Sequence, residues 1–157
     1  MRQAKNQGMA EPDSEAFERR IRQSFARQRI METIGAELTR IEHGTVEIEL
    51  DFDPKLTQQH GFLHAGILAA ALDSACGYAA YTVIDADASI LTIEFKVNLM
   101  SPGKGSRFLF RGEVTKPGSN IIVADGRAYA LRDGPAKLIA SMTGTMMVVR
   151  GREGIAG

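Results

Sequence analysis

One acidic residue, Asp73, stands out because its surroundings do not suit an ordinary structural role. It is the one charged residue between Ala65 and Ile84, a segment apolar enough on every side to form a largely buried helix. Asp prefers caps and turns, and an acid inside an apolar helix costs stability. These points favour a functional carboxylate. Small side chains are predicted to share its helical face: Gly66, Ala69, Ala70, Cys76 and Gly77.

Two structural interpretations compete with a functional one. A run of about 20 apolar residues is long enough to span a bilayer. This run, however, is rich in Ala and Gly and carries an acid near its middle. In the other interpretation, Asp73 only accepts a hydrogen bond from a neighbouring backbone amide.

A histidine pair and a single cysteine are the other residues suited to chemistry. His60 and His64 have the i, i+4 spacing of metal ligands, but His60 precedes Gly61 in a predicted loop and no third ligand is evident. We therefore predict no metal site. Cys76 lacks an obvious histidine partner, so we interpret it as a small buried side chain and not as a nucleophile.

The composition indicates one domain with no bias toward nucleic acid. The chain has 157 residues, 19 basic and 19 acidic side chains, and therefore no net charge. A single cysteine allows no intrachain disulfide, which fits a reducing compartment, and the N-terminal residues lack an apolar signal core. We expect a cytoplasmic protein.

The N-terminal part is predicted to be a disordered tail over residues 1–14, followed by a helix that Ser14 caps. Phe17, Ile21 and Phe25 recur every four residues and form an apolar stripe. The other face is basic and suits either solvent or contact with a membrane or a phosphate. Its arginines are Arg19, Arg20, Arg22, Arg27 and Arg29.

Alternating apolar and polar residues predict six strands, and the long helix follows the second of them. The strands are expected over residues 34–41, 45–52, 89–99, 108–115, 121–131 and 136–149. Strands joined by tight turns pair antiparallel, and one face of their sheet has to cover the helix. A second copy would bury the far side of the helix, so we predict an obligate oligomer. The domain is expected over residues 15–149, with a loose tail over residues 150–157.

The third strand carries one ambiguous residue. Its inward-facing side chains are predicted to be Leu91, Ile93, Phe95, Val97 and Leu99. Simple alternation then places Thr92 on the opposite face, with Glu94 and Lys96.

Three segments together resemble one family of enzymes. QQHGFLHAGILAAALD (residues 58–73) is similar to the polar-x-x-Gly-x-x-His-Gly-Gly motif, with its downstream acid, of the PaaI-like acyl-CoA thioesterases of phenylacetic acid degradation. NLMSPGKGSRF resembles a strand end and turn of that family, and SMTGTMMVV resembles its last strand. The likeness covers about residues 34–149. It implies the α+β hotdog fold, in which an antiparallel sheet wraps around a long central helix.

The resemblance also implies site residues. Asp73 takes the place of the family's nucleophile or general base, and Ala65 takes the place of a glycine whose amide polarises the thioester carbonyl. Gln58 stands where the family commonly has Asn, and Thr92 where some members have a Ser or Thr that helps to place water. Three further residues are expected to contact substrate: Leu63, His64 and Gly66. The motif departs from the family in reading His-Ala-Gly, which keeps the backbone amide but adds a methyl group.

The expected reaction is hydrolysis of an acyl-CoA to a carboxylic acid and coenzyme A, with no separate cofactor. A helix start offers unpaired amides for the carbonyl oxygen. Asp73 lies eight residues beyond Ala65, about 12 Å along a helix, so it cannot reach the same carbonyl. Antiparallel helices of two subunits would bring the two together, in a dimer or a homotetramer built as a dimer of dimers. The alternatives are a non-catalytic acyl- or CoA-binding module and an enoyl-CoA hydratase or dehydratase.

Overall fold

The computed structural model describes residues 14–155, so the tail predicted over residues 1–14 falls outside the described residues except for Ser14. The helices are α1 (Ser14–Phe25), α2 (Arg29–Ile34) and α3 (Ala65–Tyr81), with a short 3-10 turn, η1 (Pro54–Leu56). The strands are β1 (Ala36–Glu42), β2 (Thr45–Asp51), β3 (Ala88–Leu99), β4 (Arg107–Lys116), β5 (Ile121–Leu131) and β6 (Lys137–Arg150). Within the described residues, no helix is both long and apolar enough to cross a membrane.

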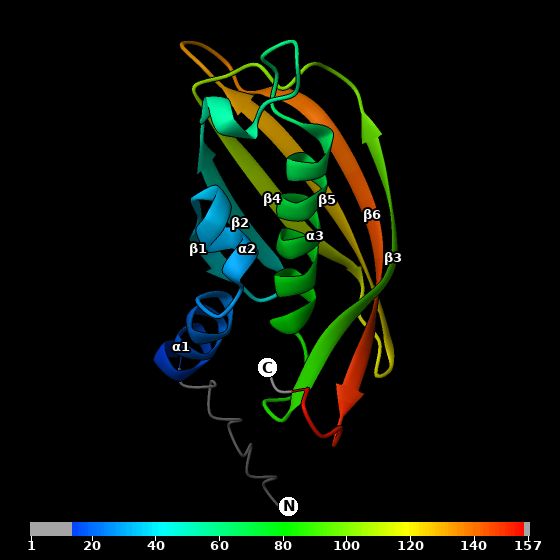
Figure 1. Cartoon of the computed structure of the whole chain (residues 1–157). Coiled ribbons are helices and arrows are strands. Elements are labelled where there is room, and N and C mark those ends of the chain that lie inside the picture. The colour runs from blue at the N-terminus through cyan, green and yellow to red at the C-terminus, as the bar shows by residue number, and fades with distance from the viewer. Residues whose placement is uncertain (1–13, 156–157) are drawn as a thin grey trace, which may run out of the picture.

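The six strands form one antiparallel sheet in the order β1-β2-β4-β5-β6-β3. The sheet curves around α3, which lies along its concave face, while α1 and α2 lie beside β1 (Figure 1). This arrangement confirms the predicted α+β architecture of a sheet wrapped around a long central helix. The core lies between that helix and the sheet, with Phe108, Phe110, Ile48 and Leu72 essentially inaccessible to solvent.

Two paired glycines set how closely α3 approaches the sheet. Gly112 of β4 lies opposite Gly126 of β5. A Cβ at position 112 would stand 2.2 Å from the Ala75 carbonyl oxygen, and one at position 126 would stand 2.9 Å from the Cys76 sulfur. The helix backbone therefore rests directly on β4, where no side chain larger than hydrogen fits.

A β-bulge in β3 changes which residues face the helix. The pairing with β6 shifts between Thr92 and Glu94, so that Thr92 pairs with Met146 and Glu94 pairs with Thr145. Met146 is fully buried beneath α3, and paired residues point to the same face of a sheet. Thr92 therefore points toward α3, and its predicted place beside Glu94 and Lys96 was wrong.

The same bulge corrects the predicted inward set on β3. Phe95 pairs with Gly144 and Val97 with Met142, both of which are buried, so these two side chains do share the helix face. Leu91 pairs with Met147, one position away from the buried Met146 and hence on the other face. The alternation of the sequence holds on each side of the bulge but not across it.

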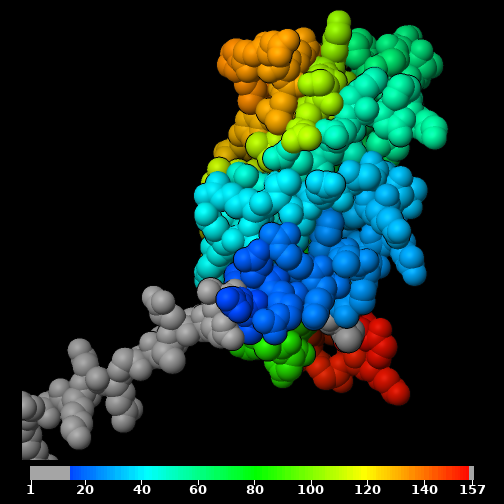
Figure 2. Space-filling view, turned by 90° about the vertical axis from the view of Figure 1, so that its left-hand side faces the viewer, coloured from blue at the N-terminus to red at the C-terminus, as the bar shows by residue number. Residues whose placement is uncertain are grey.

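The basic face predicted for the N-terminal helix is partly buried. Arg20 donates hydrogen bonds to the backbone oxygens of Tyr81 (2.7 Å) and Asp85 (3.0 Å) at the end of α3, and its guanidinium lies 4.3 Å from the centre of the Tyr81 ring. Arg22 donates to the backbone oxygen of Leu38 at 3.0 Å. These two arginines fasten α1 to the domain and are not part of a free basic surface. Figure 2 shows the dark-blue helix α1 next to the green segment that follows α3 and the red C-terminal segment, toward one end of the molecule.

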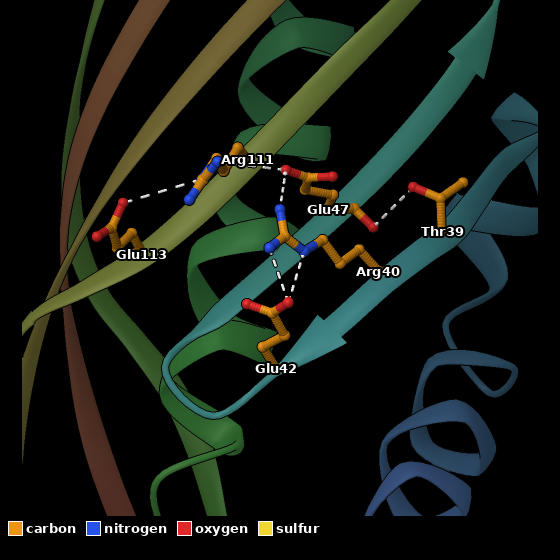
Figure 3. Close-up of polar contacts among 6 residues, drawn as sticks. All are labelled: Thr39, Arg40, Glu42, Glu47, Arg111 and Glu113. Carbon is orange, nitrogen blue, oxygen red and sulfur yellow. Dashed lines mark hydrogen bonds and ion pairs between the residues drawn. The ribbon is translucent and has the colours of Figure 1, made fainter.

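The outer face of the sheet carries ion pairs between neighbouring strands. Arg40 of β1 lies 2.7 Å from Glu42 and 3.3 Å from Glu47, and Arg111 of β4 lies 3.5 Å from Glu47 (Figure 3). Each arginine is about two-fifths exposed, so solvent weakens these pairs.

Exposed large apolar side chains gather on β3 and just beyond it: Leu91, Ile93, Phe95, Leu99 and Met100.

Candidate functional site

Helix α3 holds Asp73 on the side that the sheet leaves uncovered. Its neighbours Ala69, Ala70 and Gly77 are only partly buried, which confirms the predicted strip of small residues on this face. Cys76 does not belong to this strip. It is fully buried against Gly126, and burial raises its thiol pKa to about 12. The sulfur is therefore a protonated packing group at neutral pH, in keeping with its predicted role.

Among residues 14–155, the Asp73 carboxylate accepts a side-chain hydrogen bond from one donor, Thr92. Thr92 Oγ1 donates to Asp73 Oδ1 at 2.8 Å, across the gap between β3 and α3. Burial raises the pKa of this carboxyl group, and the hydrogen bond from Thr92 opposes that rise. A carboxylate with a raised pKa is a stronger base, and its partial burial gives it access to water or a ligand.

Asp73 and Thr92 lie in the wall of a cavity of about 330 Å³. One side is formed by α3 with Gly77 and Tyr78, and the other by the first half of β3. Ser24 and Gln28, from the end of α1 and the residue before α2, form a third side, and Gly154 and Ile155 lie at its rim. Sequence reasoning missed these last four residues. Ser24 lies at the end of the helix that the sequence presented as an amphipathic element, and Gln28 lies in the turn just after it.

The start of α3 is fixed by His64. Its backbone is extended at φ −64° and ψ 139°, and its Nδ1 accepts a hydrogen bond from the Gly66 amide at 2.8 Å. This is an N-cap, so His64 holds the first turn of α3. This bond occupies the Gly66 amide. The amide therefore does not face an open site, contrary to the expectation of unpaired amides at the helix start. The Ala65 amide has no hydrogen-bond partner among residues 14–155.

A second cavity, of about 350 Å³, lies at this end of the helix. Three of the predicted residues line it, Gln58, Leu63 and Ala65, together with Leu99 and Met100 from the end of β3. The Gln58 side-chain oxygen accepts a hydrogen bond from the backbone of His60, which fixes the loop before α3. The predicted site residues thus fall into two groups, one around Asp73 and one around Ala65.

The two groups are too far apart to act together within one chain. Eight residues of helix separate Asp73 from Ala65, which is about 12 Å along the axis at about 1.5 Å per residue. No group of three or more His, Cys, Asp or Glu side chains that could hold a metal ion occurs among residues 14–155. One cavity therefore contains a carboxylate, and the other contains a backbone N–H that has no partner among residues 14–155.

Comparison with known proteins places this arrangement in a family. The thioesterase superfamily model matches residues 60–137. The crystal structure of a thioesterase family protein from Silicibacter pomeroyi has a TM-score of 0.84 and 51% sequence identity, and the match covers 86% of this chain and 99% of that one. This chain belongs to the thioesterase superfamily. The comparisons confirm the predicted hotdog fold and a thioester hydrolase.

Two further relatives of this thioesterase are informative. The medium/long-chain acyl-CoA thioesterase YigI of Salmonella typhimurium is 28% identical, over 73% of this chain and 82% of its own length. The PaaI protein of the phenylacetic acid degradation operon of Escherichia coli has a TM-score of 0.78 at 15% identity, covering 88% of this chain and 96% of that one. At that identity the likeness to PaaI is one of fold.

Proposed function

We propose that this thioesterase hydrolyses acyl-CoA thioesters to a carboxylic acid and coenzyme A, with Asp73 as the catalytic carboxylate. The observation that carries the proposal is the Asp73 side chain, which lines a cavity, has a raised pKa and is oriented by Thr92. The name of the YigI relative supports an acyl-CoA as the substrate. Coenzyme A enters as part of the substrate, and the reaction needs no further cofactor.

Two routes fit one carboxylate. As a general base, Asp73 takes a proton from water, the water oxygen bonds to the carbonyl carbon, and the C–S bond breaks to release the thiolate of coenzyme A, which takes up a proton. As a nucleophile, it displaces that thiolate and forms an anhydride, which water then hydrolyses. In both routes negative charge develops on the carbonyl oxygen.

The stabilising donor for that oxygen is proposed to be the Ala65 amide of a second copy of the chain. This amide lies at a helix start, where the partial positive charge of the helix favours an anion, and it has no partner among residues 14–155. One such donor contributes about 3 kcal/mol to a transition state. Gln58 is proposed to position the substrate, Leu63 to line its path and Thr92 to hold Asp73.

A homodimer, or a dimer of dimers, is the proposed assembly. Within residues 14–155, strand β3 pairs with β6 on one side and has no partner on the other. Four apolar side chains on the strand and just beyond it are 41–54% exposed: Ile93, Phe95, Leu99 and Met100. An open edge with apolar side chains favours pairing with another copy. The single cysteine, fully buried, fits a cytoplasmic location.

The test is thiol release from a panel of acyl-CoAs by the wild type and by Asp73→Asn. We expect the substitution to lower kcat by at least about a hundredfold, because general-base catalysis contributes that much. Unchanged turnover by a folded Asp73→Asn protein would remove Asp73 from the mechanism. Hydration of an enoyl-CoA would favour a hydratase, and stabilisation by coenzyme A without any turnover would favour a binding module.

A further inference from the structure

The cavity beside Asp73 continues along α3 past the carboxylate, in the direction away from Ala65. Gly77, Tyr78 and Tyr81 line it on the same helix. Its volume is about 330 Å³. If the thioester lies at Asp73, as the proposed function requires, this space is where the acyl group extends.

The wall opposite β3 is polar. Ser74 Oγ donates to Gln28 Oε1 at 3.0 Å, and the hydroxyl groups of Ser24 and Tyr78 lie 3.1 Å apart. Each pair joins the α1–α2 region to α3, and all four residues line the cavity. An aliphatic acyl chain would make no hydrogen bonds with these four side chains. The polar wall therefore favours an acyl group that has a hydrogen-bonding atom of its own.

Some hydrogen-bond donors in these two pairs are not used within the pairs. Two hydroxyl groups carry two protons and share one hydrogen bond, so either Ser24 or Tyr78 keeps a proton to donate. The amide nitrogen of Gln28 carries two more and has no partner among residues 14–155. Among the residues that line the cavity in the described part of the chain, Asp73 is the one ionisable carboxylate, and there is no Lys or Arg.

We propose that this cavity selects acyl groups that carry a neutral hydrogen-bond acceptor, such as a hydroxyl group, about six bonds from the thioester carbonyl. Tyr78 lies five residues beyond Asp73, about 7.5 Å along the helix. An extended chain covers that distance in about six bonds at roughly 1.2 Å each. A carboxylate at the same position would add a second negative charge to the cavity that Asp73 lines, and Arg27, whose charge acts on Tyr78, does not itself line that cavity.

Three substrates of equal chain length separate these features: hexanoyl-CoA, 6-hydroxyhexanoyl-CoA and adipoyl-CoA. The first has no acceptor, the second has a neutral one and the third has a carboxylate. Because a plain chain leaves the spare donors unpaired, we expect kcat/KM for the hydroxyl substrate to exceed that for hexanoyl-CoA by at least about tenfold. Adipoyl-CoA should be the poorest of the three.

Two variants attribute the preference to the polar wall. Gln28→Met removes the amide at similar length, and the double variant Ser24→Ala/Tyr78→Phe removes both hydroxyl groups while keeping the ring that packs on Phe25. Each should reduce the ratio of kcat/KM between the hydroxyl and plain substrates by about threefold or more. Gln23→Met is the matched control, since Gln23 lies exposed on α1 outside the cavity, and it should keep the wild-type ratio.

The outcomes distinguish this inference from the proposed function. Equal kcat/KM for the first two substrates, or a preference that both Gln28→Met and Ser24→Ala/Tyr78→Phe leave unchanged, overturns the inference. In that case a loss of hexanoyl-CoA hydrolysis in Asp73→Asn still supports the thioesterase function. Failure to hydrolyse any of the three substrates, by a protein that thermal melting shows to be folded, would contradict both.

Discussion

At Asp73, burial and hydrogen bonding act on the carboxyl group in opposite directions. Burial raises its pKa above the usual value, and the hydrogen bond from Thr92 lowers it. Because the folded pKa lies above the unfolded one, folding disfavours the charged form. The stabilising contribution of this group is therefore present below its unfolded pKa and lost as the pH rises through its folded pKa.

We predict that Asp73→Asn, although inactive, has a larger free energy of unfolding than the wild type at pH 7. The difference should narrow as the pH falls toward the unfolded pKa. Urea unfolding at both pH values measures this, and a variant less stable than the wild type at pH 7 would contradict it.

Thr92 provides a second prediction at the residue scale. Thr92→Val keeps the shape but removes the donor to Asp73, so the pKa of the carboxyl group should rise further. The acidic limb of the kcat/KM profile should therefore move to higher pH, because the reaction uses the deprotonated form. Thr143→Val is the matched control, since Thr143 Oγ1 donates in the same way, at 2.7 Å, to Asp125. A limb that stays in place in Thr92→Val, or that moves equally in the control, would mean that Thr92 does not tune Asp73.

At the scale of elements, the seat of α3 on the sheet depends on Gly112. A Cβ there would overlap the Ala75 carbonyl, so the helix has to move away from β4. We predict that Gly112→Ala lowers the free energy of unfolding by about 2–3 kcal/mol, as overpacking of a core does. Gly77→Ala is the contrasting variant, because a Cβ at position 77 meets nothing within 4 Å, and it should raise stability by up to about 1 kcal/mol through helix propensity. Urea unfolding of both variants tests the difference, which would disappear if the contact at Gly112 could relax without loss.

The elements also show how far the sequence predicts the structure. The helix α3 and its uncovered face could be predicted from Asp73 and the small residues around it, because these residues lie close together in the sequence. The bulge in β3 could not be predicted, because it depends on the pairing with β6 and leaves no signal in the strand itself. For the same reason, alternation placed Thr92 on the wrong face. Cys76 was misplaced because the predicted strip assumed one uncovered face wide enough to include it.

At the scale of the whole molecule, one chain contains the parts of a site without assembling them. Asp73 and Ala65 line different cavities, and the open edge of β3 carries exposed apolar side chains between the two. The ion pairs on the outer face of β1, β2 and β4 are better suited to solvent. The proposed shared site therefore requires a second copy that brings its own α3 against this one, so that each Asp73 meets the Ala65 amide of the other chain.

Complementation between two inactive variants tests that shared site most directly. Asp73→Asn removes the carboxylate, and Ala65→Pro removes the amide N–H at a first helical position, where proline is tolerated. Each variant alone should lose at least about a hundredfold in kcat. When the two are unfolded together and refolded as a mixture, half of the dimers contain one chain of each kind and have one intact site. The account predicts that the mixture regains roughly a quarter of the wild-type activity. A mixture that stays as inactive as its components, while mass spectrometry of the intact dimers shows that mixed dimers have formed, would contradict a site shared between two chains.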